Sequence, residues 1–459
     1  MTWTRRHFIA AGGASLATAF VGLKHAMATD QLDGHESVFG PLRRDPRKIL
    51  DLPAAFDYRI VSSAGQEMSD GLLVPGFPDG MAAFAAADGR IRLIRNHELD
   101  PRRARADGSP FGPDCERFSE QLRPRLYDAG GRVPLSGGTT TVEIDPRSGR
   151  TIRQWLSLAG TERNCAGGTT PWGSWLSCEE SDSRADRHHG RDHGFVFEVP
   201  AAANALVDPL PLTAMGRFNH EAAAVDPRSG VVYLSEDRKD GLLYRFVPHQ
   251  RTKLHQGGVL QALVLSAWLE ADTRNWSTRK TTWDLNQRFS VRWVTLSDVE
   301  SPDDTLRHQG RSMGAAIFAR GEGLWFGDGA LYFACTSGGA QKAGQIFKYH
   351  PSPDEGQQRQ TAQPAQMTLF VESDNADVLA NCDNLTVSPW GDLIVCEDSK
   401  RSCGLVGVTA SGQCYRFAHN PYNGSELAGA CFAPDGKTLF VNLQETGLTL
   451  AINGPFPGQ

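Results

Sequence analysis

The chain has 459 residues and a formal net charge of −6, and 22% of its residues are charged. This acidic balance argues against nucleic acid as a partner, and the composition is that of a soluble globular protein. The 9 cysteines are scattered singly without a CxxC pair, which excludes a disulfide framework. Pairing of Cys403 with Cys414 across a hairpin is left open.

The N-terminus has the features of an export signal. Residues 4–9 (TRRHFI) form a twin-arginine pattern, an apolar Gly/Ala-rich run too short to span a membrane follows, and residues 26–28 (AMA) fit a cleavage site. We expect residues 1–28 to be a twin-arginine signal peptide that engages the twin-arginine export machinery. Residues 29–459 then form one periplasmic or secreted domain without a membrane span. An uncleaved amphiphilic tail is the alternative.

A short motif recurs along the rest of the chain, in which a turn containing Gly precedes an apolar strand that ends in polar residues. The copies read IRLIRNHE (91–98), SWLSCEE (174–180), VVYLSED (231–237), ALYFACT (330–336), DLIVCED (392–398) and KTLFVNL (437–443). Further alternating strands follow several copies, as in GFVFEVP (194–200), GLLYRFVP (241–248), GQIFKYHP (344–351) and GQCYRF (412–417).

This repeat, with 48 Gly and 26 Pro, predicts an all-β chain folded as a β-propeller of about six blades with loop insertions. A pair of β-sandwiches with chance similarity is the alternative. Helical periodicity is scarce, and the segment from Gly257 to Leu269 is one short helix candidate.

The repeat also predicts a site. Three copies end in an acidic pair and the first copy carries Glu98; the pairs are Glu179-Glu180, Glu236-Asp237 and Glu397-Asp398. Equivalent strand ends circle the axis of a propeller, and alternation sends only one member of each pair toward it. Crowded carboxylates repel one another unless cations lie among them. Oxygen ligands suit calcium, whereas a thiolate suits a transition metal. A solvated strand end is the alternative for any single pair.

Other segments bring further ligand types close to the repeat. Cys165 lies in NCAGG, before a Pro-Trp-Gly turn; His220 and Glu221 precede the third copy; Cys382 and Asp383 precede the fifth. A thiolate and carboxylates delivered to one place can bind a metal that accepts both sulfur and oxygen. The alternatives are a buried structural cysteine and exposed polar residues at strand starts.

Arg320 stands between Ala319 and Gly321, two residues before Glu322. An arginine in such a place can offer a planar fork to a phosphate or carboxylate, or it can form a salt bridge to Glu322. His97 and His220 can orient ligands or move protons, or they can be structural histidines bonded to backbone carbonyls.

Taken in order, these blocks resemble the PhoX-type alkaline phosphatases. The resemblance is carried by the twin-arginine start, MSDG, PDGM, NHE, NCAGG with TPWGSWLSCEE, RFNHEAAAVDP, VYLSED, ARGEG, TSGG, GQIFKY, CDNL with SPWGDLIVCED, and APDG with TLFVN. It implies a β-propeller phosphatase that hydrolyses phosphate monoesters through a cluster of ferric iron and calcium ions with a bridging oxo group.

The resemblance also implies residue roles. Cys165 would bind iron, carboxylate ligands would fall on Glu180, Glu221 and Glu322, and Arg320 would bind the substrate phosphate. Three more acids lie in matching motifs and complete the expected metal-ligand set: Glu98, Asp383 and Glu397. A family lysine near the substrate has no match; Ser157 and Thr161 stand in that neighbourhood. The chain is also shorter than the larger members.

Two other function classes stay open at this point. A calcium-dependent propeller lactonase or esterase needs oxygen ligands alone, so it gives Cys165 no role. A non-enzymatic propeller that binds a partner predicts no metals and an exposed apolar or aromatic face.

Overall fold

The computed structural model describes residues 38–103, 108–130, 133–277, 282–399, 403–422 and 424–458. The expected signal peptide, residues 1–28, lies outside the described residues. Among the described residues, no helix is long and apolar enough to cross a membrane. All nine cysteines are free, so Cys403 and Cys414 do not pair.

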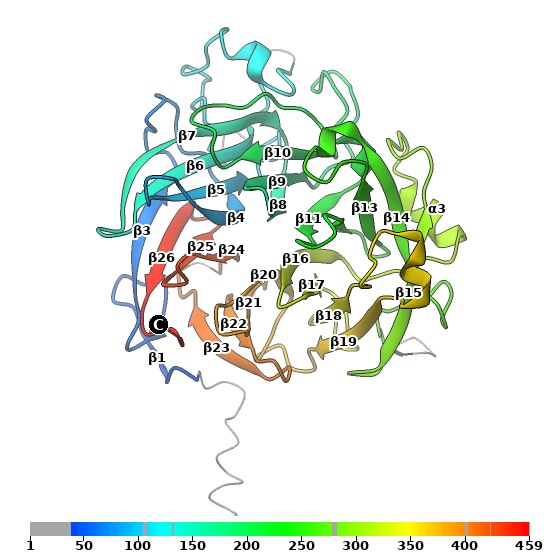
Figure 1. Cartoon of the computed structure of the whole chain (residues 1–459). Helices are drawn as coiled ribbons and strands as arrows, with labels where there is room; N and C mark the ends of the chain where they lie inside the picture. Colours follow the sequence, from blue (N-terminus) through cyan, green and yellow to red (C-terminus); the bar gives the residue numbers. More distant parts are fainter. Residues whose placement is uncertain are drawn as a thin grey trace, which may run out of the picture.

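The β-sheets stand around a central axis as the blades of a propeller, which confirms the predicted fold class (Figure 1). Six strands are the first of their groups and lie nearest the axis: β4 (Pro78–Ala85), β8 (Asn164–Thr169), β11 (His220–Val225), β16 (Gly321–Gly327), β20 (Cys382–Val387) and β24 (Leu427–Phe432). Each contacts the next one along the chain, and β24 contacts β4, so the ring of first strands is closed.

Each copy of the sequence repeat forms the second strand of a group, paired antiparallel with the first strand. These strands are β5 (Ile91–His97), β9 (Ser174–Glu179), β12 (Val232–Glu236), β17 (Ala330–Cys335), β21 (Leu393–Glu397) and β25 (Thr438–Leu443). Apolar side chains on both of their faces suit strands that are covered by neighbouring blades.

The outer strands complete the groups, and most of the predicted alternating segments are among them. They are β6 (Gly137–Asp145), β7 (Arg150–Thr161), β10 (Val196–Pro200), β13 (Leu243–Pro248), β14 (Gly258–Leu265), β18 (Gln345–His350), β19 (Gln366–Glu372), β22 (Gly404–Val408), β23 (Cys414–His419), β26 (Leu448–Asn453) and β3 (Asp57–Ser63). GQCYRF lies in β23, which is a fourth strand because β22 precedes it. The N-terminal β3 pairs with β26 and so joins the two ends of the described chain in one blade.

One expectation is wrong. The segment from Gly257 to Leu269 is not a helix: most of it forms β14, which pairs with β13 and with β15 (Arg288–Thr295). The pairing on both edges overrides the local pattern, as tertiary contacts often do. Because β15 also pairs with β19, two blades are joined at their outer edges into one nine-stranded sheet.

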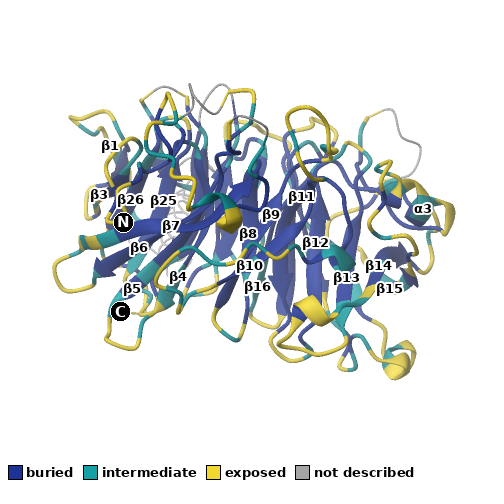
Figure 2. Cartoon of the chain, turned by 90° about the horizontal axis from the view of Figure 1, so that it is seen from above, coloured by how far each residue is buried: buried dark blue, intermediate teal, exposed yellow. Residues whose placement is uncertain are grey.

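The remaining elements are short and lie between or outside the blades. They are β1 (Leu42–Arg43), β2 (Leu52–Pro53), α3 (Leu306–Ser312), and the 3₁₀ turns η1 (Arg123–Arg125), η2 (Thr213–Met215), η3 (Leu254–Gln256) and η4 (Gln358–Ala362). The strands are buried between blades whereas the loops at both ends are exposed (Figure 2). Polar groups that converge on the axis therefore do so inside an apolar frame.

Candidate metal centre

A β-bulge near the start of every first strand builds the centre. In each one, the pairing with the second strand shifts register, so that two residues of the first strand oppose one of its partner. In five strands the residue that opens the bulge is an acid or a thiol: Asp79, Cys165, Glu221, Glu322 and Asp383. Equivalent bulges thus bring ligand-type side chains from five blades to the axis.

The sixth strand, β24, carries Gly429 at the same place, with φ of 65°. A Cβ atom there would lie 2.3 Å from the backbone oxygen of Asp79. Only glycine fits this position, because the conformation is left-handed and the neighbouring bulge lies against it.

The ligand atoms form two groups that share Glu221. In the first, those of Cys165, Glu180 and Glu221 lie within 4.8 Å of one another. In the second, those of Glu221, Glu322 and Asp383 do so. Sulfur with two carboxylates suits a transition metal, whereas three carboxylates suit a hard cation such as calcium.

The electrostatics of the groups fit bound cations. Burial raises the pKa of Glu221 and of Glu322, and the neighbouring acids raise both further. Burial, with nearby Asp398, raises the pKa of Asp383 to about 7. Among the described residues, Asp79 Oδ1 is buried with no hydrogen-bond partner. Buried acids that lack partners are costly, and a cation among them removes this cost.

Asp79 was missed by the sequence reasoning, and it lies beside the expected Glu98. Gln444 Nε2 donates to Asp79 Oδ2 at 2.8 Å and to Glu98 Oε2 at 3.0 Å. Glu98 also accepts from Arg163 Nη2 at 3.4 Å. Glu98 therefore lies at the edge of the centre but in neither three-ligand group. The available signal for Asp79 was its place just before a repeat copy, which it shares with Glu221 and Asp383.

The acidic pairs at the second-strand ends divide between two roles. Strand alternation sends the first members away from the groups: Glu179 accepts from His193 Nδ1 at 2.7 Å, and Glu236 accepts from the Tyr244 hydroxyl at 2.8 Å. Glu397 accepts from the Ala380 amide at 2.9 Å and is ion-paired with Arg416. Glu397 lies in neither group, and these contacts hold its carboxylate within its own blade.

The contacts of Arg320 fit both roles considered for it from the sequence, the salt bridge and the binding of an anion. Its Nε and Nη2 donate to the carboxylate of Asp237 at 2.8 Å and 2.7 Å, and Nη2 lies 3.2 Å from Glu322 Oε1. The salt bridge to Glu322 is therefore present. Its side chain is still 38% exposed, so part of the guanidinium is accessible beside the second group.

His97 and His220 match the structural alternative. His97 Nδ1 lies 2.9 Å from the Gly76 carbonyl, and His220 Nε2 lies 3.0 Å from the Gly216 carbonyl. Burial lowers the pKa of both, that of His220 to about 3. Both imidazoles contact backbone carbonyls near the bulges. Ser157 is equally occupied, since its hydroxyl lies 2.8 Å from that of Thr139.

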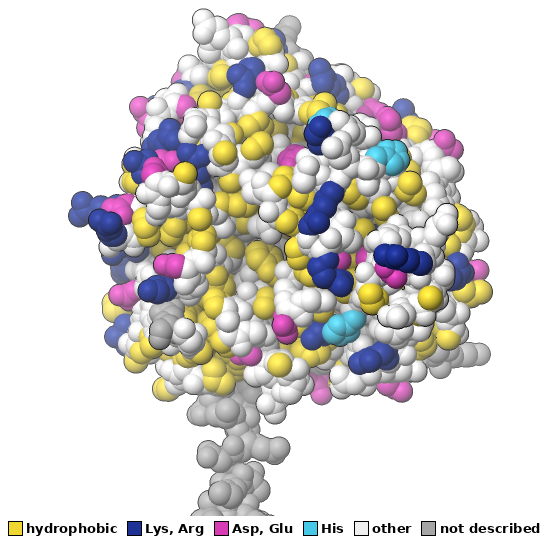
Figure 3. Space-filling view, in the orientation of Figure 1, with side chains coloured by type: hydrophobic (Ala, Val, Ile, Leu, Met, Phe, Trp, Pro, Cys, Tyr) yellow, Lys and Arg dark blue, Asp and Glu magenta, His cyan; other side chains and the backbone are white. Residues whose placement is uncertain are grey.

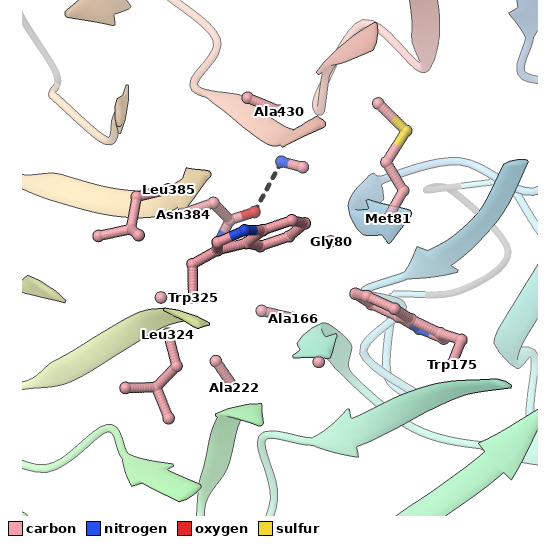
Figure 4. Close-up of a pocket in the computed structure, with 13 residues that line it drawn as sticks. Gly80, Met81, Ala166, Trp175, Ala222, Leu324, Trp325, Asn384, Leu385 and Ala430 are labelled. Carbon is pink, nitrogen blue, oxygen red and sulfur yellow. Dashed lines mark hydrogen bonds between the residues drawn. The ribbon is translucent and has the colours of Figure 1, made fainter. Parts of the chain in front are cut away.

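One residue further along each first strand, the side chains around the axis are mostly small and no longer acidic. The second bulge residue is Gly or Ala in five strands, which lets the first strands approach closely; the sixth is Asn384, whose Oδ1 accepts from the Gly429 amide at 2.6 Å. These residues surround a space of about 20 Å³ that is also lined by Met81, Leu324 and Trp325 (Figure 4). This holds one water at most.

Trp325 packs against the apolar clusters of two different blades, next to this space. Hydrophobic side chains also gather around the centre of one face of the molecule (Figure 3). The narrow apolar space gives way to the acids toward the strand starts, so we place the mouth of the centre on the side where Arg320 lies.

Comparisons with known proteins identify a family and a related fold. A family model described as alkaline phosphatase PhoX matches residues 37–447. The structure of Pseudomonas fluorescens PhoX in complex with vanadate, a transition state analogue, matches with a TM-score of 0.66 and 19% identity, over 92% of this chain and 98% of that chain. A gluconolactonase from Xanthomonas campestris has a TM-score of 0.40 and 13% identity, over 91% and 98% of the two chains. No curated protein sequence matches the chain.

Proposed function

The chain belongs to the alkaline phosphatase PhoX family and is a phosphoric ester hydrolase, and from this premise we propose that it hydrolyses phosphate monoesters at the two ligand groups that share Glu221. The observation that carries the proposal is a thiol whose sulfur lies within 4.8 Å of oxygens from two carboxylates, next to a second group made of carboxylates alone. We propose iron for the group with Cys165 and calcium for the group with Asp383.

The residues fit these metals by number and chemistry. Cys165, Glu180 and Glu221 would hold the iron, and Glu221, Glu322 and Asp383 would hold the calcium. Bound there, the ions would supply Lewis-acid charge for the phosphoryl oxygens and activation of the attacking nucleophile. Asp79 and Glu98 add negative charge at the edge of the centre and can accommodate further calcium.

The chain's own side chains would then bind and orient the ester. Arg320 can donate from Nη1 to a phosphate oxygen, while Asp237 fixes its other edge. The narrow apolar space along the axis restricts the exchange of water from behind the centre. His97 and His220 would hold the backbone beside the centre through their contacts with the Gly76 and Gly216 carbonyls. A metal-activated nucleophile is consistent with this, because it requires no protein nucleophile.

The site also bears on the other function classes. A lactonase or esterase with oxygen ligands alone leaves Cys165 without a role, although it is buried among carboxylates. The letters GRSMG (310–314) match a serine nucleophile motif, but Ser312 ends helix α3 and donates to the Gln309 carbonyl instead of standing on a strand-to-helix turn. A binding propeller has no use for either ligand group. We further propose export through residues 1–28 and action on small phosphate esters in the periplasm or outside the cell.

The test is elemental analysis of the purified exported protein, combined with hydrolysis of p-nitrophenyl phosphate. We expect both iron and calcium, with Cys165→Ser losing iron and most activity while keeping part of the calcium, because sulfur is the softest ligand of the set. Cys431→Ser is the matched control, because Cys431 is a buried thiol on the first strand β24. This variant should keep the metal content of wild type. Calcium without a transition metal, with hydrolysis of a lactone, would favour the lactonase instead.

A further inference from the structure

A second arginine, Arg163, lies at the first ligand group as Arg320 lies at the second. Arg163 Nη2 is ion-paired with Glu180, which belongs to the group with Cys165. Arg320 Nη2 is ion-paired with Glu322, which belongs to the group with Asp383. We propose that Arg163 is a second phosphate-binding residue and that, with Arg320, it sets a preference for the doubly charged phosphate monoester. The proposal rests on the proposed function.

The two arginines occupy equivalent positions in the repeat. Each stands two residues before the residue that opens the bulge, and both have a left-handed backbone, with φ of 44° at Arg163 and 55° at Arg320. Such a conformation is strained for a residue other than glycine. Phe77 and Asn381 share it at the same place in two other blades, with φ of 46° and 52°. The conformation therefore recurs at this position in four blades with three different side chains. In two of these blades the side chain is an arginine.

A continuous arc of hydrogen bonds joins the two arginines across three neighbouring blades. Glu180 accepts from Arg163, and its other oxygen, Oε1, accepts from Asn219 Nδ2 at 2.8 Å. The same Asn219 nitrogen donates to the Asp237 carbonyl at 3.1 Å, and the Asp237 carboxylate accepts from Arg320. The arc links the two guanidinium groups, whose partners Glu180 and Glu322 belong to the two ligand groups that share Glu221.

Both guanidinium groups keep donors for a ligand. Within the part of the chain that the structure describes, Arg163 donates only from Nη2, to Glu98 and Glu180, which leaves Nε and Nη1. Arg320 donates from Nε and Nη2, which leaves Nη1. Their side chains are 37% and 38% exposed, so solvent and solutes reach them. The phosphate of a monoester has three non-bridging oxygens, and guanidinium donors suit such oxygens well.

The charge at the mouth favours the same ligand. A phosphate monoester carries two negative charges near neutral pH, whereas a diester carries one. Acids surround both ligand groups and repel an anion, and cations at the mouth add to the positive charge that bound metal ions would supply against this repulsion. Arg163 and Arg320 are the arginines ion-paired with members of the described groups, one with each. Removing one of these arginines should therefore weaken the binding of the doubly charged monoester more than the binding of the singly charged diester.

The experiment compares Arg163→Gln and Arg163→Lys with wild type and with Arg184→Gln, an exposed arginine paired with Asp303. Three quantities are measured on each metal-loaded protein: iron and calcium content, the Kd for inorganic phosphate by equilibrium dialysis, and kcat/KM for p-nitrophenyl phosphate and bis(p-nitrophenyl) phosphate. Arg163→Lys keeps the charge beside Glu98 and Glu180, so it remains informative if Arg163→Gln fails to fold.

We expect Arg163→Gln to keep its metals, to bind phosphate about 10–100-fold more weakly, and to lose about 10–100-fold in kcat/KM on the monoester, with a smaller loss on the diester. Arg163→Lys should lie between it and wild type. Loss of iron in both Arg163 variants would overturn the proposal in favour of a purely structural role. Unchanged phosphate affinity with full metal content would overturn it as well. A wild-type protein that lacks metals or hydrolyses neither ester contradicts the proposed function, while phosphate dialysis still tests Arg163.

Discussion

The carboxylate of Asp237 accepts hydrogen bonds from both Nε and Nη2 of Arg320, at 2.8 Å and 2.7 Å. One edge of the guanidinium is therefore bound to protein, and Nη1 alone is left to meet a ligand within the described chain. Asp237 comes from the end of β12, in the blade before the one that carries Arg320. The carboxylate thus acts as a positioning group between two blades.

Asp237→Asn should leave the metals in place and lower activity. The amide can accept only one of the two hydrogen bonds, so Arg320 loses its fixed orientation while it keeps its contact with Glu322. We expect kcat/KM for a phosphate monoester to fall about 10-fold, the scale of one charge-assisted hydrogen bond. Asp182→Asn, which alters an exposed partner of Arg238, is the control. Wild-type kinetics for Asp237→Asn would show that the orientation of Arg320 is unimportant.

Arg320→Lys and Glu322→Gln should separate substrate binding from metal binding within one short motif. Lysine keeps the charge but loses the planar arrangement of donors, so we expect full metal content and a rate lowered by about 10²–10³. Glu322→Gln removes a ligand charge from the second group and should lower calcium content. Elemental analysis and steady-state kinetics distinguish the two. If Arg320→Lys loses metal as Glu322→Gln does, Arg320 supports the centre structurally.

Removal of metal should make stability depend on pH in a defined direction. The pKa values of Glu221 and Glu322 are raised by burial, and that of Asp383 is raised to about 7. An acid with a raised pKa in the folded state contributes stability that is complete below its unfolded value, near 4, and is lost as pH rises through the folded value.

The metal-free protein should therefore have a Tm that falls between about pH 5 and pH 8. Calcium should raise Tm more at pH 8 than at pH 5, because ionised carboxylates bind it; at a free concentration of 100 times Kd the gain is about 2.7 kcal/mol. Thermal denaturation after chelation, with and without added calcium, measures this. A metal-free Tm that rises over the same interval would contradict the assignment of these acids as buried and crowded.

The strands that carry the repeat were predictable because each copy combines a turn Gly with an apolar run. The position of the centre was predictable only in part. Spacing pointed to the ends of the second strands, where Glu180 does face the group with Cys165, but the other ligands come from bulges in the first strands. A bulge depends on pairing between strands, and a single sequence does not display pairing. Glu397 lies outside both groups because strand alternation turns it toward Arg416.

Arg163 also had no signal of its own in the sequence. It precedes Asn164 in a turn with no flanking glycine, whereas Arg320 is followed by Gly321. Its equivalence to Arg320 appears only in the backbone, where both have positive φ two residues before a bulge. The β14 segment shows a similar limit, because its periodicity fits a helix until β13 and β15 pair with it.

Gly429→Ala should destabilise the protein and disturb Asp79. The new Cβ would lie 2.3 Å from the Asp79 carbonyl, and the left-handed φ adds strain. The backbone must shift, so we expect a loss of about 2 kcal/mol or more together with weaker metal binding. Gly391→Ala is the matched control, since its φ is 94° but no atom lies within 4 Å of the added Cβ. It should cost only about 1 kcal/mol. Equal effects on Tm and metal content would mean that the contact with Asp79 does not matter.

His193 is a buried positive group behind the centre, and its effect on stability should depend on pH. Burial lowers its pKa, but this is outweighed by Glu179 and Asp128, so its pKa rises to about 10. Its Nδ1 lies 2.7 Å from Glu179, the neighbour of Glu180, and its Nε2 lies 3.3 Å from Asp128. The imidazolium thus holds the end of β9, from which Glu180 reaches the first ligand group.

A base with a raised pKa in the folded state contributes stability that is complete below its unfolded value, about 6.5, and is lost as pH rises through the folded value. His193→Gln cannot carry the charge, so its Tm should lie well below that of wild type at pH 7, since breaking a buried ion pair costs about 3–5 kcal/mol. The difference should narrow toward pH 10, as wild type loses the same charge. His249→Gln, an exposed histidine, should show no such difference. A Tm gap that stays constant from pH 7 to pH 10 would mean that the charge of His193 does not hold Glu179 in place.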